Sequence, residues 1–373
     1  MSSEPAPEKK RTNRWMITCA IVVVIIGALA WALFEEDFEG ETETAEFASQ
    51  SQAPRLALWS EFIPYAVLET QLIEIASHEL DLYVAFNASE PDFDGFARLV
   101  RKAKAMGIGV RPWLLLDVKD GYWFNKWNVE KNAEFALTFL DEMAKRDVEI
   151  EWITFDIEPP QSLVAKIQDA FAKRHFGEAL GALKASARSA SLLRAIEQTK
   201  SLVAKLHVRR VKVHAVTTNF VLNDSSSLRI QNALGTPIGD VPFDEVSFMV
   251  YRPELEKILG EGLSSRIVKT YSKRAKKKFG VRAAIDIGEA GFVPFPVPFQ
   301  GFREPAELQT DLAAVRSVGI DRIHIYSLDG LTELGVATWL APTRIKPIPR
   351  IDLKATLFVK SISLLRNLLP EAE

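Results

Sequence analysis

The chain has 373 residues, of which 47% are hydrophobic, and its formal net charge is −3. This composition allows one large globular domain with appendages, and the lack of net positive charge argues against a nucleic-acid partner. Cys19 is the single cysteine, so the chain can form no internal disulfide.

The first 53 residues differ in composition from the rest. Residues 15–34 carry no charge, and about 20 apolar residues at ~1.5 Å each span the ~30 Å hydrocarbon core of a bilayer. Basic residues in the segment 1–14 and acidic residues after position 34 predict, by the positive-inside rule, a single-pass anchor with a cytoplasmic N-terminus and an extracytoplasmic domain, in the periplasm or at the cell surface. A cleaved signal peptide is the alternative, because Ala-x-Ala spacings occur at 28–32. Residues 35–53 are acidic and polar, which predicts a flexible linker.

Strand-like and helix-like segments then alternate along the chain. Short apolar, β-branched or aromatic runs predict eight strands, at 55–60, 80–87, 108–116, 150–157, 211–218, 245–251, 281–287 and 322–327. Apolar residues at three- and four-residue spacing predict helices between them, at 92–106, 128–146, 161–207, 253–279 and 304–318.

This alternation is typical of a (β/α)₈ TIM barrel, here over residues 54–342. The stretch 161–207 is too long for one barrel helix and predicts an inserted pair of helices, and 343–373 predicts a C-terminal amphipathic tail. A doubly wound open sheet is the alternative fold, but no G-x-G-x-x-G follows the first strand.

The fourth strand ends with two carboxylates on one face. Side chains alternate with period 2 along a strand, so Thr154, Asp156 and Glu158 share a face. Such a pair suits acid/base chemistry, because one carboxyl is kept protonated by its neighbour's charge or by burial. Capping of the next helix is the alternative role.

In a barrel, functional side chains lie at the C-terminal ends of the strands. The other strand ends carry Trp59 and Glu61, Asn87, Asp117, Asn219, Tyr251 and Arg252, Asp286 and Glu289, and Tyr326 and Asp329. Trp123 and Trp127, in the loop after the third strand, have flat faces suited to stacking on sugar rings. We expect these groups to form a polar cup that binds a substrate.

The histidines give little support for a metal centre. His214 and His324 lie in the middle of predicted strands, and no Cys or H-E-x-x-H spacing accompanies them. We therefore predict neither a metal nor a cofactor.

Three motifs resemble those of glycoside hydrolase family 18, the chitinase and endo-N-acetylglucosaminidase group. Phe155-Asp156-Ile157-Glu158 resembles the end of that family's D-x-x-D-x-D-x-E signature, residues 249–251 resemble its Met-x-Tyr, and 325–330 resemble its Trp-Ser-x-Asp ending. Thr154 and Glu151 stand where the family has its two earlier aspartates.

The resemblance implies a retaining mechanism in which the substrate's own N-acetyl group attacks the anomeric carbon. Glu158 would be the proton donor, and Asp156 would orient the acetamide. Tyr251 would donate a hydrogen bond to the acetamide oxygen, and Tyr326 would form the floor of the sugar site. The implied partner is an extracytoplasmic carbohydrate polymer or oligosaccharide.

Two alternatives stay open. Glu158-Pro159 also resembles the end of strand four in the large retaining clan of cellulase-like and galactosidase-like barrels, in which case Glu289 would be the nucleophile. The loss of the earlier motif aspartates instead favours a non-catalytic glycan-binding barrel at the cell envelope.

Overall fold

The computed structural model describes residues 56–372 except 174, 260–261, 294–298 and 333. The expected cytoplasmic segment 1–14, membrane anchor 15–34 and linker 35–53 lie outside the described residues. Within the described ranges, no helix is both long enough and apolar enough to cross a bilayer.

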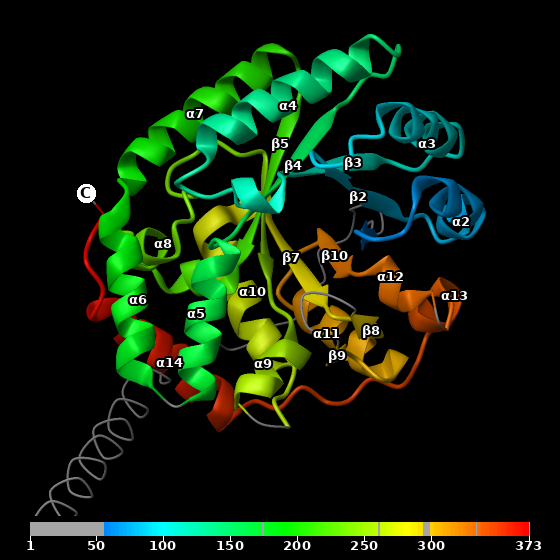
Figure 1. Ribbon diagram of the computed structural model, residues 1–373. Helices are drawn as coiled ribbons and strands as arrows, with labels where there is room; N and C mark the ends of the chain where they lie inside the picture. Colours follow the sequence, from blue (N-terminus) through cyan, green and yellow to red (C-terminus); the bar gives the residue numbers. More distant parts are fainter. Residues whose placement is uncertain (1–55, 174, 260–261, 294–298, 333, 373) are drawn as a thin grey trace, which may run out of the picture. The chain divides into compact units, whose positions relative to one another are not determined.

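Eight parallel strands close into a barrel, in the order β1-β10-β7-β6-β5-β4-β3-β2 (Figure 1). The strands are β1 (Leu56–Ser60), β2 (Asp81–Asn87), β3 (Val110–Leu115), β4 (Trp152–Ile157), β5 (Lys212–Thr218), β6 (Glu245–Met249), β7 (Ala283–Gly288) and β10 (Ile323–Tyr326). Each falls on one of the eight predicted runs, so the predicted (β/α)₈ barrel is confirmed and the open doubly wound sheet is excluded. A short antiparallel pair, β8 (Phe292–Val293) and β9 (Phe299–Gln300), follows β7.

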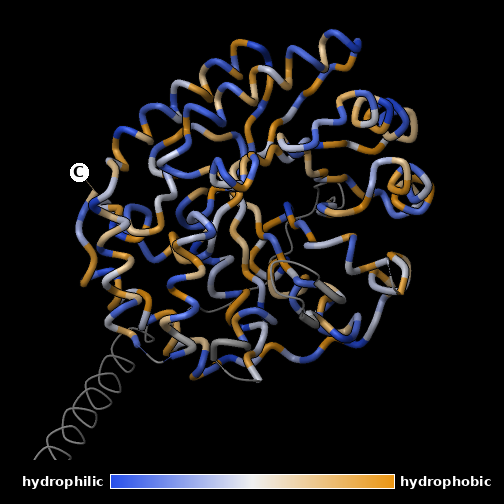
Figure 2. The backbone as a smooth tube through the Cα atoms, viewed as in Figure 1, coloured by the Kyte–Doolittle hydropathy of each residue, from blue (hydrophilic) through white to orange (hydrophobic). Residues whose placement is uncertain are grey.

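Helices surround the strands in Figure 1. They are α2 (Tyr65–Ser77), α3 (Phe93–Ala105), α4 (Val129–Ala144), α5 (Gln161–Ala172), α6 (Phe176–Ser189), α7 (Leu192–Val208), α8 (Arg229–Leu234), α9 (Arg252–Leu259), α10 (Arg266–Phe279), α11 (Pro305–Arg316), α12 (Leu328–Leu331), α13 (Val336–Leu340) and α14 (Leu353–Asn367). Hydrophobic and hydrophilic residues alternate along their turns in Figure 2, as expected for helices that bury one face.

Two predicted helical stretches are divided further than the sequence indicated. The insertion at 161–207 contains three helices, α5, α6 and α7, rather than two. The last of them begins where the Ser191 side chain accepts a hydrogen bond from the Arg194 amide, a helix N-cap. The stretch 253–279 is likewise divided into α9 and α10.

The barrel wall separates two apolar clusters. Outward-facing residues of the strands, such as Phe155 and Ile157 of β4, belong to the large core between barrel and helices. The inward-facing cluster is smaller and mainly aromatic, with Trp59, Tyr83 and Trp113 at its centre. Alternation along each strand therefore directs Asp156 into the barrel, as predicted.

Candidate active site

A cavity of about 320 Å³ opens at the C-terminal ends of the strands. Its lining includes five carboxyl groups, from Glu61, Asp156, Glu158, Glu254 and Glu289. Aromatic side chains form much of the remaining wall, from Trp59, Trp113, Trp123, Phe220, Tyr251 and Tyr326. Among the described residues, no lysine, arginine or histidine lines this cavity.

Asp156 and Glu158 form a hydrogen-bonded pair of carboxyl groups at the end of β4. The loop after β3 holds this end in place, because the Phe124 amide donates to the Asp156 carbonyl at 2.8 Å and the Glu158 amide donates to the Phe124 carbonyl at 3.1 Å. This short bridge extends the pleat past Ile157, so both carboxyls face the cavity. The predicted pairing of these two residues is thus present.

The carboxyl pair retains a proton at neutral pH. Burial raises the pKa of Asp156 well above its usual range, and the charge of Glu158 adds to this effect. Burial, followed by the charge of Glu254, raises the pKa of Glu158 to about 8, although its hydrogen bond with Asp156 acts in the opposite direction. Two close carboxyls that cannot both ionise are a common source of a general acid.

Glu61, one of the groups expected in the polar cup, is a further carboxyl of the cavity and is half-buried. It accepts hydrogen bonds from the hydroxyls of Tyr122 at 2.8 Å and Tyr326 at 2.6 Å. Burial raises its pKa to about 7, against the lowering effect of the two tyrosines. Its place just after the first strand, two residues beyond Trp59, was the sequence signal that assigned it to the cup.

Tyr251 and Tyr326 stack at the wall of the cavity, with ring centroids 5.6 Å apart and an interplanar angle of 23°. Burial, and then the charge of Asp286, raises the pKa of the Tyr251 phenol well above its usual value. Both phenols therefore stay protonated and can donate hydrogen bonds. Glu289 is 9% exposed, and its charge acts on both tyrosines.

The cavity also contains buried polar atoms without a hydrogen-bond partner among the described residues. They are Asp156 Oδ1, Asn219 Nδ2 and Trp113 Nε1, in side chains that are 3–5% exposed. One is an acceptor and two are donors, so the site can satisfy a ligand that presents both kinds of group.

Trp59, in the cavity wall, is held in position by a hydrogen bond and by two neighbouring aromatic rings. Its indole N–H donates to Asp286 Oδ1 at 3.0 Å, and its ring stacks on Tyr83 at 4.2 Å between centroids. Trp113 meets the same ring edge-on at 5.0 Å. The Trp59 face is therefore fixed before any ligand enters.

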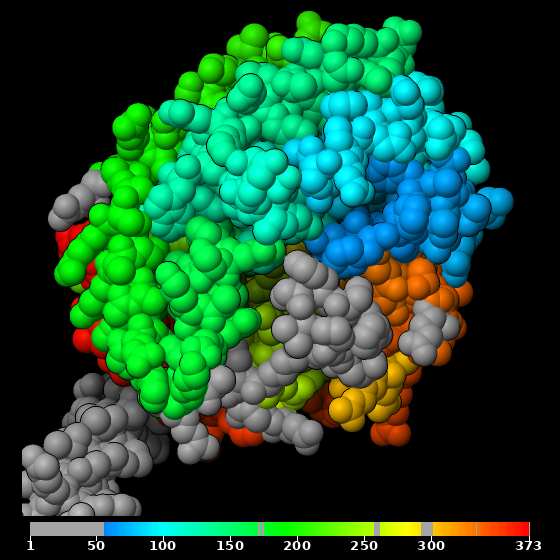
Figure 3. Space-filling model, in the orientation of Figure 1, coloured from blue at the N-terminus to red at the C-terminus, as the bar shows by residue number. Residues whose placement is uncertain are grey.

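The loop that carries Trp123 is tied to the inserted helices through Lys126. This lysine is 5% exposed, and its ammonium donates to the Ser186 carbonyl on α6 at 2.9 Å and to the Asn232 carbonyl on α8 at 3.0 Å. Burial lowers its pKa to about 8. In Figure 3 the turquoise segment that contains this loop lies directly against the green surface of the inserted helices.

The predicted site residues divide into two groups. Asp156, Glu158, Tyr251, Glu289, Trp59, Trp123, Asn219 and Tyr326 line the cavity together. Asn87, Asp117, Trp127, Arg252 and Asp329 do not line it, so their role in substrate binding stays a prediction.

These five side chains are occupied by structural contacts. Asn87 accepts from the Ser89 amide, and Asp117 caps a short 3₁₀ turn at the Lys119 amide. The indole N–H of Trp127 donates to the Ser189 hydroxyl. Arg252 is 7% exposed and pairs with buried Asp311 at 3.1 Å. Asp329 accepts from three consecutive backbone amides, those of residues 61–63, and so holds Glu61 in position.

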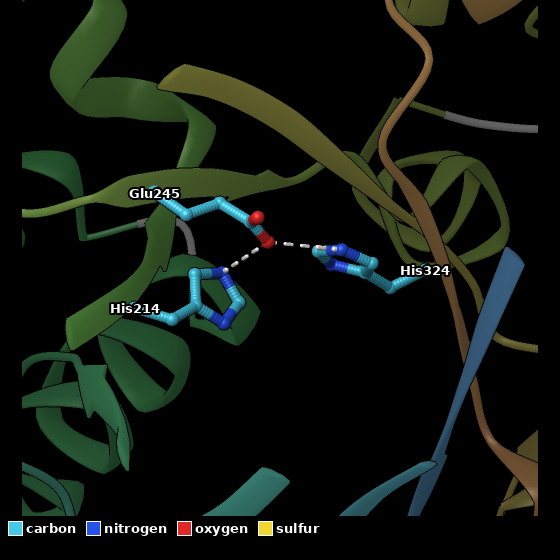
Figure 4. A group of neighbouring side chains, drawn as sticks. All are labelled: His214, Glu245 and His324. Atoms are coloured by element: carbon cyan, nitrogen blue, oxygen red, sulfur yellow. Dashed lines mark ion pairs between the residues drawn. The ribbon is translucent and has the colours of Figure 1, made fainter. Parts of the chain in front are cut away.

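His214, Glu245 and His324 meet inside the barrel, where the ring nitrogens of both histidines face the Glu245 carboxylate (Figure 4). Their Nε2 atoms lie 3.7 Å and 3.2 Å from Glu245 Oε1. These residue types can bind a metal. However, Arg111 Nη1 lies 3.0 Å from the same oxygen and Arg322 Nε lies 3.5 Å from the other. A divalent cation would lie beside these guanidinium groups, so we assign no metal to the cluster.

No protein-family model matches the chain, and no curated protein matches it in sequence. Solved structures similar to this chain include the spore cortex-lytic enzyme SleL of Bacillus megaterium QM B1551, with 10% identity and a TM-score of 0.46 over 79% of this chain and 74% of that chain. Active domain 2 of the chitinase from Pyrococcus furiosus has 11% identity and a TM-score of 0.43 over 87% and 99%. The YdjI aldolase from Escherichia coli K12 has 11% identity and a TM-score of 0.38 over 86% and 92%. At these identities and TM-scores the similarities assign no activity to this chain.

Proposed function

We propose that this protein is a retaining glycoside hydrolase in which Glu158 is the proton donor. The observation that carries this proposal is the proton-sharing Asp156–Glu158 pair at the base of a cavity walled by aromatic rings. A carboxyl that is still protonated at neutral pH can donate to a glycosidic oxygen, and aromatic faces stack on sugar rings. The same carboxylate then accepts a proton from the water that completes hydrolysis.

We favour the acetamide-assisted form of this mechanism. In that form the substrate's acetamide oxygen bonds to the anomeric carbon as the glycosidic bond breaks, and the leaving oxygen takes the Glu158 proton. Asp156 would accept a hydrogen bond from the acetamide N–H, and Tyr251 would donate one to its oxygen. The unpartnered acceptor Asp156 Oδ1 and donor Asn219 Nδ2 support this assignment, because an amide supplies one donor and one acceptor.

The separation of the Glu158 and Glu289 carboxyls distinguishes this form from a double displacement. A nucleophile for double displacement would face Glu158 at ~5–5.5 Å across the scissile bond. Both side chains line the same cavity, so the turnover of Glu289→Gln decides between the two forms.

The charge of the cavity restricts the class of sugar. It is lined by five carboxyls and, within the described residues, by no cationic side chain. A carboxylated or sulfated sugar would be repelled by each ionised group, at a cost of roughly 1–3 kcal/mol per pair of unit charges ~6 Å apart for an effective dielectric constant of ~20–40. We therefore propose neutral or cationic glycans as substrates.

Turnover of N-acetylglucosamine oligomers and of a glycan panel by the purified full chain tests this function. Glu158→Gln should abolish hydrolysis, whereas Glu134→Gln, at an exposed position on α4, should leave it unchanged. Glu289→Gln should reduce turnover only partly under acetamide assistance but should abolish it under double displacement. Equal turnover by Glu158→Gln and the unsubstituted protein would refute the assignment.

A glycan-binding barrel without turnover is the second candidate. It is favoured by Thr154 and Glu151, which stand where the family it resembles has aspartates. Binding measured by calorimetry, with no product from any glycan in the panel, would select it.

We also propose that residues 15–34 anchor the barrel on the extracytoplasmic side of a membrane. The support is the uncharged run and the opposite charges that flank it. Resistance of the membrane-bound protein to alkaline extraction, together with protease access to the barrel in intact cells, would be the expected result. A mature N-terminus near residue 32 would instead identify a cleaved signal peptide.

A further inference from the structure

A chain of buried hydrogen bonds runs from the interior of the barrel to the cavity. His324 lies between two carboxylates, with Nε2 3.2 Å from Glu245 Oε1 and Nδ1 2.8 Å from Asp286 Oδ1. The same Asp286 oxygen accepts the indole N–H of Trp59 at 3.0 Å. The residues of this chain, which we call the inner relay, are Glu245, His324, Asp286 and Trp59, and none is more than 3% exposed.

The two carboxylates of the inner relay differ in how their charge is balanced. Glu245 has Arg111 at 3.0 Å and Arg322 at 3.5 Å in addition to His324. In the part of the chain that the structure describes, the ion pairs of Asp286 are limited to the one with His324. A fully buried carboxylate is stable as an ion only with a cationic partner, so the charge of Asp286 depends on His324.

The surroundings of His324 favour its cationic form. Burial alone would lower the pKa of its imidazole, but the charge and hydrogen bond of Asp286, followed by those of Glu245, raise the pKa above its usual value. Only the doubly protonated ring donates through both nitrogens. The charged or titratable groups that face His324 and Asp286 are Tyr83 on β2, Arg111 on β3, Asp156 on β4, His214 on β5, Glu245 on β6 and Tyr251 after β6.

The inner relay ends next to the proposed acid pair. The charge of Asp286 acts on Asp156 and on Tyr251, and in both cases it disfavours ionisation. Trp59, at the same end, lines the cavity. One buried carboxylate therefore acts on both the proton of the acid pair and the position of an aromatic wall.

We propose that His324 is a positioning residue that keeps Asp286 in place as an anion, so that Asp286 holds the Trp59 wall and keeps the proton on the Asp156–Glu158 pair. This inference rests on the proposed function for its effect on turnover, but not for the charge state of His324. His324 itself does not line the cavity.

His214 is a matched control for His324. It is also fully buried, and its Nε2 lies 3.7 Å from the same Glu245 oxygen. However, its hydrogen-bond partner is the Ser247 hydroxyl at 2.9 Å, and burial lowers its pKa well below the usual value. His214→Gln should thus perturb the barrel interior to a similar degree without changing the charge balance of Asp286.

The first test is the charge state of the two histidines in the full chain in detergent. With ¹⁵N,¹³C-histidine labelling, five side chains contribute signals, and His214→Gln and His324→Gln assign the two buried ones. We expect both ring nitrogens of His324 to carry protons at pH 7 and His214 to be neutral. A neutral His324 at pH 7 would overturn the proposal, whether or not the protein hydrolyses a glycan.

The second test is the pH profile of kcat/KM on an N-acetylglucosamine oligomer. In His324→Gln, Asp286 loses its cation and, with it, its own negative charge. In Asp286→Asn, the residue loses that charge directly but keeps an oxygen that can accept from Trp59. Both limbs should move to lower pH by about one unit, as expected when one charge at ~6 Å is removed. KM should rise severalfold in His324→Gln but less in Asp286→Asn.

The outcome is judged against His214→Gln, with folding of each variant checked by circular dichroism. A His324→Gln profile that superimposes on that of His214→Gln would overturn the proposal. If no glycan is turned over, the proposed function fails separately. The pKa values of the Asp156–Glu158 pair are then measured from its ¹³C-carboxyl resonances in the same variants. They should fall in His324→Gln and in Asp286→Asn. Equal values in His324→Gln and His214→Gln would overturn the proposal.

Discussion

Replacing Glu158 by glutamine should make the protein more stable at alkaline pH. The pKa of Glu158 is raised to about 8 in the folded protein from an ordinary value of 4.5. Between these pH values the unfolded chain loses this proton and the folded protein keeps it, so the free energy of unfolding falls as pH rises. The pKa difference corresponds to about 5 kcal/mol at ~1.36 kcal/mol per pH unit. Since the side chain is half-buried, solvent screening reduces the expected loss to about 2–3 kcal/mol.

Glutamine keeps the size and hydrogen-bonding capacity of a protonated glutamate but cannot ionise. Denaturant unfolding at pH 5 should therefore give Glu158→Gln and the unsubstituted protein nearly equal stabilities. At pH 9 the variant should be more stable by about 2–3 kcal/mol, and Glu134→Gln should follow the unsubstituted protein throughout. A stability difference that is the same at pH 5 and pH 9 would show that the burial of this carboxyl has been misjudged.

Three further predictions concern neighbouring residues. Affinity for a permanently cationic, N-trimethylated glucosamine oligomer should increase as pH rises through about 7, where Glu61 ionises, and calorimetry should find this dependence absent in Glu61→Gln. Asp329→Ala removes the acceptor of three backbone amides and should lower the free energy of unfolding, measured with denaturant, by about 2–3 kcal/mol. An unchanged free energy of unfolding would show that water replaces Asp329 as the acceptor. Tyr251→Phe removes a donor at the acetamide oxygen and should lower kcat by roughly 10- to 100-fold with little change in KM; steady-state kinetics showing only a KM effect would contradict that role.

The sequence was sufficient to predict the strands and the carboxyl pair. The eight apolar runs correspond to the eight barrel strands. A strand of a parallel sheet is buried on both faces, and its sequence is therefore continuously apolar. The alternation along the fourth run placed Asp156 and Glu158 on one face, since that depends only on local geometry.

Contacts between distant strands could not be predicted in this way. Arg252 and Asp329 stand at strand ends like true cavity residues, but Asp311 and three backbone amides occupy them. The partners of Glu61 arrive from a loop after β3 and from β10, and those of His324 from β6 and β7. Such pairings depend on barrel closure and register, which a single sequence does not specify.

The buried ammonium of Lys126 has a consequence for how this barrel can be altered. By bonding at once to α6 and α8, it joins the inserted helices to the loop that presents Trp123. Deleting the insertion to obtain a minimal barrel would remove the Ser186 acceptor and leave this cation with its two contacts to Asn232, so the loop would lose its tie to α6. The insertion therefore helps to position the loop that carries Trp123, and a variant with a shortened 161–207 segment should also need a new residue at position 126.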